Sequence, residues 1–218
     1  MTTTVEVRPH VALSLRRAPV VGVVRTGSFD EAERQARLFA DSGIELVEIT
    51  FTVPDAPRLV RDLLARRGGA GPPWFGMGTV TTAARAREAV SAGAEFIVSP
   101  NVSSDVARIA RGAGLFLILG ALTPTEVVAA HELGADIVKV YPLPPVGGPS
   151  YLSTLRQPLG DIPMLAAGGF GVEDINDYAR AGAVAFGMGP TLLGTDEEET
   201  RGRIARALAM AQVGKEVR

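Results

Sequence analysis

One lysine stands in the middle of an apolar segment. Lys139 is at the centre of Ile-Val-Lys-Val-Tyr, in a chain whose 22 basic residues include only two lysines, Lys139 and Lys215. Lysine is seldom buried without a partner or a chemical purpose. Apolar surroundings favour the neutral, nucleophilic form of an amine, whereas arginine stays protonated. We therefore interpret Lys139 as a candidate covalent residue. The structural alternative is a lysine that pairs with a strand carboxylate or extends to solvent.

A carboxylate occurs in a similar setting. Glu48 lies in Leu-Val-Glu-Ile-Thr and shares its strand parity with Thr50 and Thr52. A buried carboxylate close to an amine can carry protons during a reaction. The alternative is a structural ion pair with Lys139 or Arg25. Together, a buried amine and a buried carboxylate indicate chemistry more strongly than either does alone.

Groups that could bind an anion follow several apolar segments. Arg25 ends the first of them, with inward parity if Val21 and Val23 point inward, and is a candidate carboxylate clamp. Exposed amides in glycine-rich turns can hold a carboxylate or a phosphate. Such turns contain Gly78 and Thr79, Gly168 and Gly169, and Gly187 and Gly189. The alternatives remain open, because tight strand-to-helix turns need glycine anyway and Arg25 could simply face solvent.

Residues for metal chemistry are sparse. His10 and His131 have no companion at metal-ligand spacing, so we predict no metal site. The chain has no cysteine, which excludes disulfides, cysteine-zinc sites and thiol nucleophiles. Trp74 is better explained as a core or interface residue than as a stacking platform.

The elements that would position these residues repeat along the chain. A helix, a glycine and a short apolar strand recur around Gly43, Gly93, Gly114, Gly134 and Gly182. Glycine suits the left-handed residue that ends a helix. We expect strands at 19–24, 44–50, 74–78, 95–99, 115–119, 136–141, 163–167 and 184–188. Eight βα units favour a closed (β/α)8 TIM barrel over an open doubly wound sheet, which usually has fewer strands at this length.

The whole chain, 1–218, is expected to form one barrel domain. Residues 1–18 would be an N-terminal flanking segment and 195–218 a C-terminal helix. Ser28 with Glu31, and Thr123 with Glu126, fit capping boxes at helix starts. In such a barrel, function is expected at the carboxyl ends of the strands, where the candidate residues lie.

Composition narrows the class of protein. Hydrophobic residues make up 46% and charged residues 21%, which is typical of a globular protein. The formal net charge is −2 and the basic residues are scattered, so we expect no nucleic-acid partner. The longest apolar run, 115–119, is far below the ~20 residues of a membrane span, and no signal peptide is visible. We expect a cytoplasmic protein that does not bind membranes.

Taken in order, the motifs resemble those of the 2-keto-3-deoxy-6-phosphogluconate (KDPG) / 4-hydroxy-2-oxoglutarate (KHG) aldolase family. They are VEIT at Glu48, GMGTV at Thr79, VSPN at Asn101, LTPTE from Leu122, VKVYP at Lys139, GGPSYL from Gly147 and AAGGF from Ala166. The resemblance spans roughly 19–193. It implies a (β/α)8 barrel, a homotrimer, and a reaction that needs no external cofactor.

The resemblance also implies roles for individual residues. Lys139 would form a Schiff base and Glu48 would be the general acid and base. The Gly78–Thr79 turn would bind the carboxylate of a keto acid. The glycines after the seventh and eighth strands (Gly168, Gly169, Gly187 and Gly189) would hold a distal phosphate.

Three positions depart from better-known members of that family. Thr52 stands where many have an arginine, and Arg25 could supply the missing charge. Ala167 and Pro190 stand where a threonine and a serine are usual, which removes hydroxyls from the expected phosphate site. A charge-assisted hydrogen bond contributes roughly 1.5–3 kcal/mol. These losses would therefore lower the affinity of the protein for a phosphorylated substrate by about ten- to a hundredfold.

Two functions of different classes remain. The first is a class I aldolase that cleaves a 2-keto-3-deoxy (phospho)sugar acid or 4-hydroxy-2-oxoglutarate to pyruvate and an aldehyde. The second is a barrel that keeps this scaffold and binds a keto acid or phosphate without turnover. A phosphate-binding barrel lyase or synthase of another family would leave Lys139 unexplained.

Overall fold

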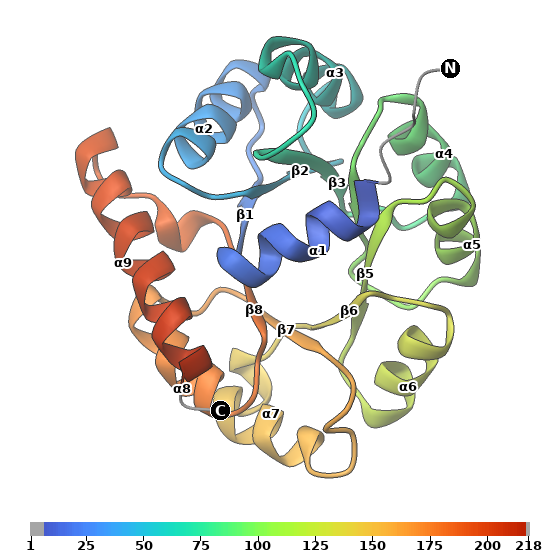
Figure 1. The fold of residues 1–218 in the computed structure, drawn as a ribbon, viewed down its shortest axis with the longest axis vertical. Coiled ribbons are helices and arrows are strands. Elements are labelled where there is room, and N and C mark those ends of the chain that lie inside the picture. The colour runs from blue at the N-terminus through green and yellow to red at the C-terminus, as the bar shows by residue number, and fades with distance from the viewer. Residues whose placement is uncertain (1–6, 217–218) are drawn as a thin grey trace.

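A computed structural model describes residues 7–216, with side chains as far as Gln212. Parallel strands close into a barrel in the order β1 to β8, and a helix follows each strand (Figure 1). The strands are β1 (Val20–Val24), β2 (Leu46–Thr50), β3 (Trp74–Gly78), β4 (Phe96–Val98), β5 (Phe116–Ala121), β6 (Ile137–Val140), β7 (Met164–Ala167) and β8 (Ala185–Met188). The predicted (β/α)8 barrel is therefore confirmed, and each strand lies in its expected segment except β5, which runs two residues further, to Ala121.

The helices after α1 form a ring outside the strands, and α1 crosses the middle of this ring (Figure 1). They are α1 (Val7–Arg17), α2 (Phe29–Asp41), α3 (Ala56–Arg67), α4 (Ala83–Ser91), α5 (Ser104–Gly112), α6 (Pro124–Glu132), α7 (Gly148–Arg156), α8 (Ile175–Arg180) and α9 (Glu197–Glu216). Short 3-10 turns, η1 (Pro144–Val146), η2 (Val172–Asp174) and η3 (Pro190–Leu192), lie in the last three strand-to-helix connections. The expected N-terminal flanking segment, 1–18, contains α1, and the expected C-terminal helix, 195–218, is α9. Residues 1–6 and 217–218 of these segments lie outside the described residues.

Several strands begin later than the sequence pattern predicts. Gly43, for example, adopts a positive φ of 95° after α2, and the next residue, Ile44, donates its N–H to the Phe39 carbonyl at 3.1 Å. Ile44 therefore completes the end of the helix instead of starting β2. The same bond closes α4, α5, α6 and α8; at α5 its donor, Leu115, was also expected in a strand, so β5 starts one residue late for the same reason.

The two predicted capping boxes have different outcomes. At α6, Thr123 accepts the Glu126 N–H and the Glu126 carboxylate accepts the Thr123 N–H, as expected. At α2, Ser28 accepts the Glu31 N–H as expected. The predicted return bond, from the Ser28 N–H to the Glu31 carboxylate, is wrong. The Glu31 carboxylate instead accepts from Arg34 and Gln35, and the bond from Arg34 is the main reason that the pKa of Glu31 is lowered.

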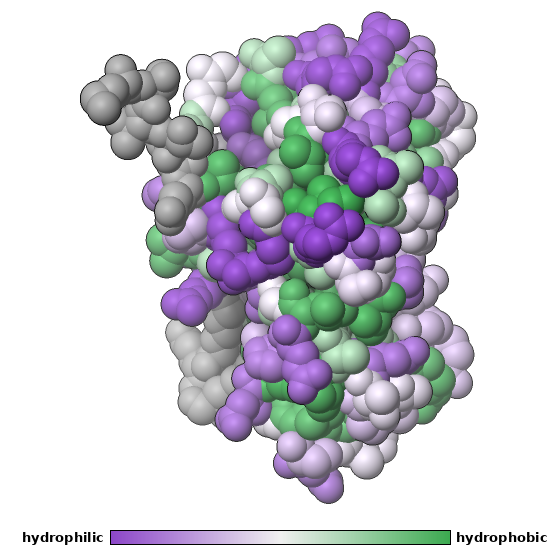
Figure 2. Space-filling model, turned by 90° about the vertical axis from the view of Figure 1, so that its right-hand side faces the viewer, coloured by the Kyte–Doolittle hydropathy of each residue, from purple (hydrophilic) through white to green (hydrophobic). Residues whose placement is uncertain are grey.

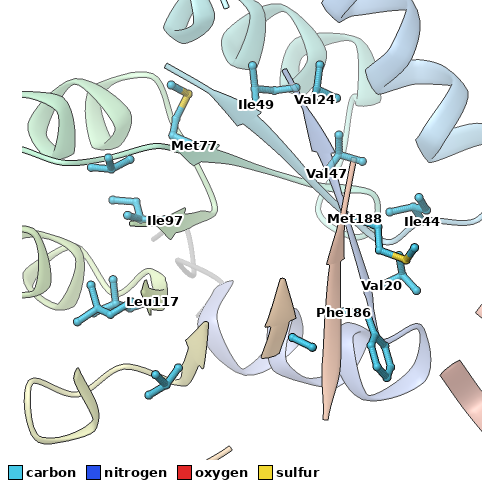
Figure 3. Close-up of a cluster of buried hydrophobic side chains, with 14 of the residues drawn as sticks. Val20, Val24, Ile44, Val47, Ile49, Met77, Ile97, Leu117, Phe186 and Met188 are labelled. Carbon is cyan, nitrogen blue, oxygen red and sulfur yellow. The ribbon is translucent and has the colours of Figure 1, made fainter. Parts of the chain in front are cut away.

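The core has two layers. One lies between the barrel and its helices, and Figure 3 shows part of it, with Val47, Phe186 and Met188 among the labelled side chains. The other fills the barrel interior and includes Leu46 and Phe96 together with α1. In Figure 1, α1 crosses the middle of the ring, where it closes the amino-terminal end of the barrel. The carboxyl ends of the strands remain the open end.

A largely buried ion pair, Arg67 with Glu95, lies at the closed end of the barrel. Glu95 accepts two hydrogen bonds from the Arg67 guanidinium, at 2.8 and 2.9 Å, and a third from the Phe75 N–H at 2.9 Å. Arg67 also lies over the ring of Trp74, whose indole N–H donates to Ser14 of α1 at 2.8 Å. Trp74 is a buried core residue, as the sequence indicates.

One face of the molecule carries α4 and α5 (Figure 1). Polar and apolar side chains are interspersed over the face that carries α4 and α5 (Figure 2). Among the described residues, none of the helices has the length and apolar character needed to span a bilayer.

Candidate active site

Strand parity places both candidate catalytic residues inside the barrel. Leu46 and Ile137, each two residues before a candidate, belong to the interior cluster, so Glu48 and Lys139 face inward as well. Strands in a closed barrel of this type are staggered by about one residue per strand. Followed through the observed register, this stagger brings Glu48 of β2 and Lys139 of β6 into the same layer, on opposite sides of the interior.

The layer immediately above these two residues, toward the open end, is mostly glycine and alanine. By the same register it contains Val23, Gly78, Gly120 and Ala167. A filled barrel usually carries bulky branched residues in its layers. Although Val23 and Gly187 face the interior, both are only half-buried, so solvent reaches this depth. We use the word cavity for this solvent-accessible open end of the barrel, beneath which Glu48 and Lys139 lie.

Glu48 occupies space that only glycine leaves open. A Cβ atom on Gly78 would lie 1.8 Å from Glu48 Oε1, far inside contact distance. Glu48 is buried, with 2% of the residue exposed. The described ion pairs include none between Glu48 and either Lys139 or Arg25, so the structural alternative raised by the sequence does not account for the buried carboxylate.

Lys139 is buried beside an aromatic ring. Its residue exposure is 9%, and its Nζ lies 5.4 Å from the centroid of the Tyr141 ring. Its register neighbours are Gly120 and Leu165, neither of which carries a charge. Among the ion pairs of the described residues, Lys139 has no carboxylate partner, so the amine stands inside the barrel with one face against an aromatic ring.

Arg25 lies at the rim of the cavity, next to two of the other predicted residues. Its Nη1 donates to Thr52 Oγ1 at 3.5 Å and its Nη2 to Thr79 Oγ1 at 3.2 Å. Thr79 has a left-handed backbone, with φ 58°, at the turn that follows β3. Three residues that are distant in sequence thus form one cluster that can bind an anion. Thr50 belongs to the same cluster and was not among the predicted site residues; its only signal was the parity it shares with Glu48.

The predicted glycines divide into two kinds. A Cβ atom on Gly168 would lie 2.9 Å from the Leu143 nitrogen, and one on Gly189 would lie 2.7 Å from the Val23 oxygen. Close backbone packing therefore explains glycine at these two positions. Gly187 faces the cavity in the layer of Lys139, and Gly169, with φ 89°, has open space where a side chain would be. Gly169 and Gly187 are thus the glycines of this group that a ligand could approach.

Metal ligands do not converge anywhere in the part of the chain that the structure describes: no three histidine, aspartate or glutamate side chains could share an ion. His10 stacks on Trp74 at the closed end, with 6.4 Å between the ring centroids, and His131 is exposed on α6. The chemical groups available at the open end are an amine, a carboxylate, a guanidinium and several hydroxyls.

An eight-stranded barrel with these groups at the carboxyl ends of its strands is an enzyme scaffold suited to small anionic carbonyl compounds. The sequence model for KDPG and KHG aldolase matches residues 11–207, and the chain belongs to that family. It is therefore an aldolase, one of the aldehyde-lyases.

Individual relatives agree with this assignment. The chain is 33% identical over 203 residues to a probable 2-dehydro-3-deoxy-6-phosphogalactonate aldolase of Rhizobium meliloti, covering 92% of this chain and 94% of the relative. It is 30% identical over 177 residues to the 2-dehydro-3-deoxy-6-phosphogalactonate aldolase of Escherichia coli, covering 81% and 85%. A solved structure described as native KDPGal superposes with a TM-score of 0.82 at 28% identity, covering 91% of this chain and 96% of that one.

Proposed function

We propose that Lys139 and Glu48 carry out a class I aldolase reaction on a 2-keto-4-hydroxy acid, releasing pyruvate and an aldehyde. The single observation behind this proposal is the placement of both residues in one interior layer, on opposite sides of the barrel near its open end. A substrate carbon chain between them would have its ketone near the amine and its hydroxyl near the carboxylate.

The steps follow from these positions. Lys139 Nζ attacks the C2 ketone, and the carbinolamine loses water to give an iminium ion. This cation accepts the electron pair of the C3–C4 bond when that bond breaks, while Glu48 takes the proton of the C4 hydroxyl directly or through one water. The enamine is then protonated at C3, and water hydrolyses the new iminium ion to free pyruvate and Lys139. The cycle needs no external cofactor.

Arg25 and Thr79 are the proposed ligands of the substrate carboxylate. A guanidinium and a hydroxyl that lie 3.2 Å apart at the rim of the cavity can both donate to one anion. Thr52, which stands where many family members have an arginine, accepts from Arg25 and so helps to orient the replacement charge. The Gly78–Thr79 turn contributes to the same subsite.

The distal end of the substrate would lie toward Gly168, Gly169, Gly187 and Gly189. The relatives named above are aldolases of a phosphorylated sugar acid. Ala167 offers no hydroxyl here, and exposed Pro190 offers neither a hydroxyl nor an N–H. We therefore propose a 2-keto-3-deoxy sugar acid or 4-hydroxy-2-oxoglutarate as substrate, with weaker dependence on a phosphate than in relatives that carry these hydroxyls.

Borohydride trapping tests the covalent step. Incubation with pyruvate and borohydride should add a stable mass to the peptide that contains Lys139, and Lys139→Ala should abolish both the adduct and pyruvate release from substrate. A panel of phosphorylated and unphosphorylated 2-keto-4-hydroxy acids, coupled to lactate dehydrogenase, would then identify the aldehyde. An adduct only at Lys215, or no turnover of any acid in the panel, would refute the proposal in favour of a barrel that binds without catalysis.

We also propose a homotrimer located in the cytoplasm. The support is the family resemblance together with the lack of a membrane-spanning helix in the described range. Light scattering during gel filtration should give three times the mass of the chain, and a monomeric mass would contradict the trimer. Fractionation of the source cells should recover the protein with cytoplasmic markers.

A further inference from the structure

Three threonine hydroxyls surround the guanidinium of Arg25 in a connected chain. Thr50, which is fully buried, lies with its Oγ1 2.9 Å from the Val24 carbonyl oxygen and 2.7 Å from Thr52 Oγ1. Thr52 Oγ1 then lies 3.5 Å from Arg25 Nη1, and Arg25 Nη2 lies 3.2 Å from Thr79 Oγ1. The chain thus runs from the wall of the barrel to the rim of the cavity.

The direction of each hydrogen bond in this chain is fixed by the number of protons. A hydroxyl has one proton, a carbonyl only accepts and a guanidinium only donates. Because Thr50 gives its proton to the Val24 carbonyl, Thr52 must be the donor to Thr50. Thr52 therefore has no proton left and presents only lone pairs to Arg25, which is what a guanidinium requires.

Thr79 has the complementary role at the far side of Arg25. It accepts from Arg25 Nη2, and none of the described hydrogen bonds uses the proton of its own hydroxyl. The guanidinium has five N–H groups, and the two threonines engage only two of its nitrogens. The remaining N–H donors and the Thr79 O–H can thus converge on one acceptor at the cavity rim, and a carboxylate has the two oxygens that such a pair of donors requires.

We propose that Thr50 is a positioning residue for the substrate carboxylate. It acts through Thr52, whose hydroxyl it holds as an acceptor, and Thr52 in turn holds Arg25 beside Thr79. This inference rests on the proposed function, from which it takes the keto acid as ligand. It adds that carboxylate affinity depends on a buried hydroxyl that never contacts the substrate.

Thr50→Val tests the hydroxyl, because valine keeps the shape of the side chain and removes its donor. The measurement is the pyruvate concentration that gives half of the maximal borohydride adduct. We expect Thr50→Val to raise it about tenfold, the size of one weakened hydrogen bond to a charged group, with the maximal adduct unchanged. In turnover, KM should rise while kcat stays within about twofold, since neither Lys139 nor Glu48 is disturbed.

Two matched variants separate positioning from a purely structural role. Thr50→Ser removes the methyl group but keeps the hydroxyl, so it should bind pyruvate within about twofold of the wild type even if its unfolding temperature falls. In an Arg25→Met background, Thr50→Val should add no further loss, because the residue through which it acts is gone. If Thr50→Val does not fold, Thr52→Val breaks the same chain at an exposed position and should give the same tenfold shift.

The outcomes are distinguishable. Three results would each overturn the positioning role while leaving the aldolase proposal intact. Thr50→Val could need the same pyruvate concentration for half-maximal adduct as the wild type, or Thr50→Val and Thr50→Ser could raise that concentration equally. Thr50→Val could also raise it by the same factor with and without Arg25. No adduct in the wild-type protein would overturn the proposed function, and this inference with it.

Discussion

Replacing Gly78 with alanine should separate the role of Glu48 from the stability of the barrel. The new Cβ would lie 1.8 Å from Glu48 Oε1 and 2.4 Å from its Cδ and Cγ atoms, so the carboxylate must leave its present position. Gly78 is not among the glycines with positive φ, so alanine introduces no backbone strain there. The substitution therefore moves one functional group without changing it chemically.

The expected effect is on the proton-transfer step. Positioned acid–base groups contribute about 10²–10⁴-fold to rates, so Gly78→Ala should lower kcat by at least ~10²-fold. The Lys139 adduct with pyruvate should still form, because the amine lies across the cavity from the new methyl group. Steady-state turnover and borohydride trapping, measured on the same preparation, test both statements.

Gly76→Ala is the matched control. Gly76 lies two residues earlier on β3 with the same inward parity, but a Cβ atom there would meet the ring of Phe96 at 2.5 Å and not Glu48. Overpacking costs roughly 1–3 kcal/mol, so this variant should unfold at lower urea while its kcat changes little. If Gly78→Ala keeps kcat within threefold of the wild type, or if Gly76→Ala loses as much activity, the assignment of Glu48 is refuted.

Further predictions concern the closed end, the last helix and the distal subsite. Glu95→Gln leaves the largely buried Arg67 guanidinium, which is 15% exposed, without its charge partner and should lower the free energy of unfolding by about 3 kcal/mol in urea titrations; a loss below 1 kcal/mol would contradict this. Hydrogen bonds from the N–H and hydroxyl of Thr195 and from Arg203 lower the pKa of Glu199 from 4.5 to about 2. The ionised Glu199 carboxylate should therefore contribute fully to folding stability above pH 4.5, and this contribution should be lost as the pH falls toward 2. The difference in unfolding temperature between wild type and Glu199→Gln should therefore shrink between pH 5 and pH 2. Restoring hydroxyls with Ala167→Thr and Pro190→Ser should lower KM about tenfold for phosphorylated acids and leave it unchanged for unphosphorylated ones.

The fold was predictable because its signals are local. Each glycine that ends a helix and each apolar strand can be recognised within about ten residues of sequence. Two of the boundary errors have a local cause as well: Ile44 and Leu115 look like strand residues, but their N–H groups complete the preceding helix. Glu31 failed as a capping residue because Arg34 and Gln35, one turn further along, compete for its carboxylate.

The site was predictable only in part. Parity along one strand correctly placed Lys139 and Glu48 on the inner face of the barrel. That they share a layer depends on the stagger of a closed sheet, which accumulates over four strands and leaves no trace in any single segment. The hydroxyl chain around Arg25 joins residues up to 54 positions apart, and its polarity becomes visible only when the distances are known.

The size of inward-facing residues carries a signal that parity alone does not. Phe96, Phe116 and Leu165 lie toward the closed end, whereas Gly78, Gly120 and Ala167 face inward nearer the open end. The Glu48 side chain occupies the space beside Gly78, and the Pro100 backbone occupies the space beside Gly120, so neither position has room for a larger residue. Small inward-facing residues near the carboxyl ends of β3 and β5 therefore indicate where a functional side chain or a loop enters the barrel, whether or not any residue there is recognised as catalytic.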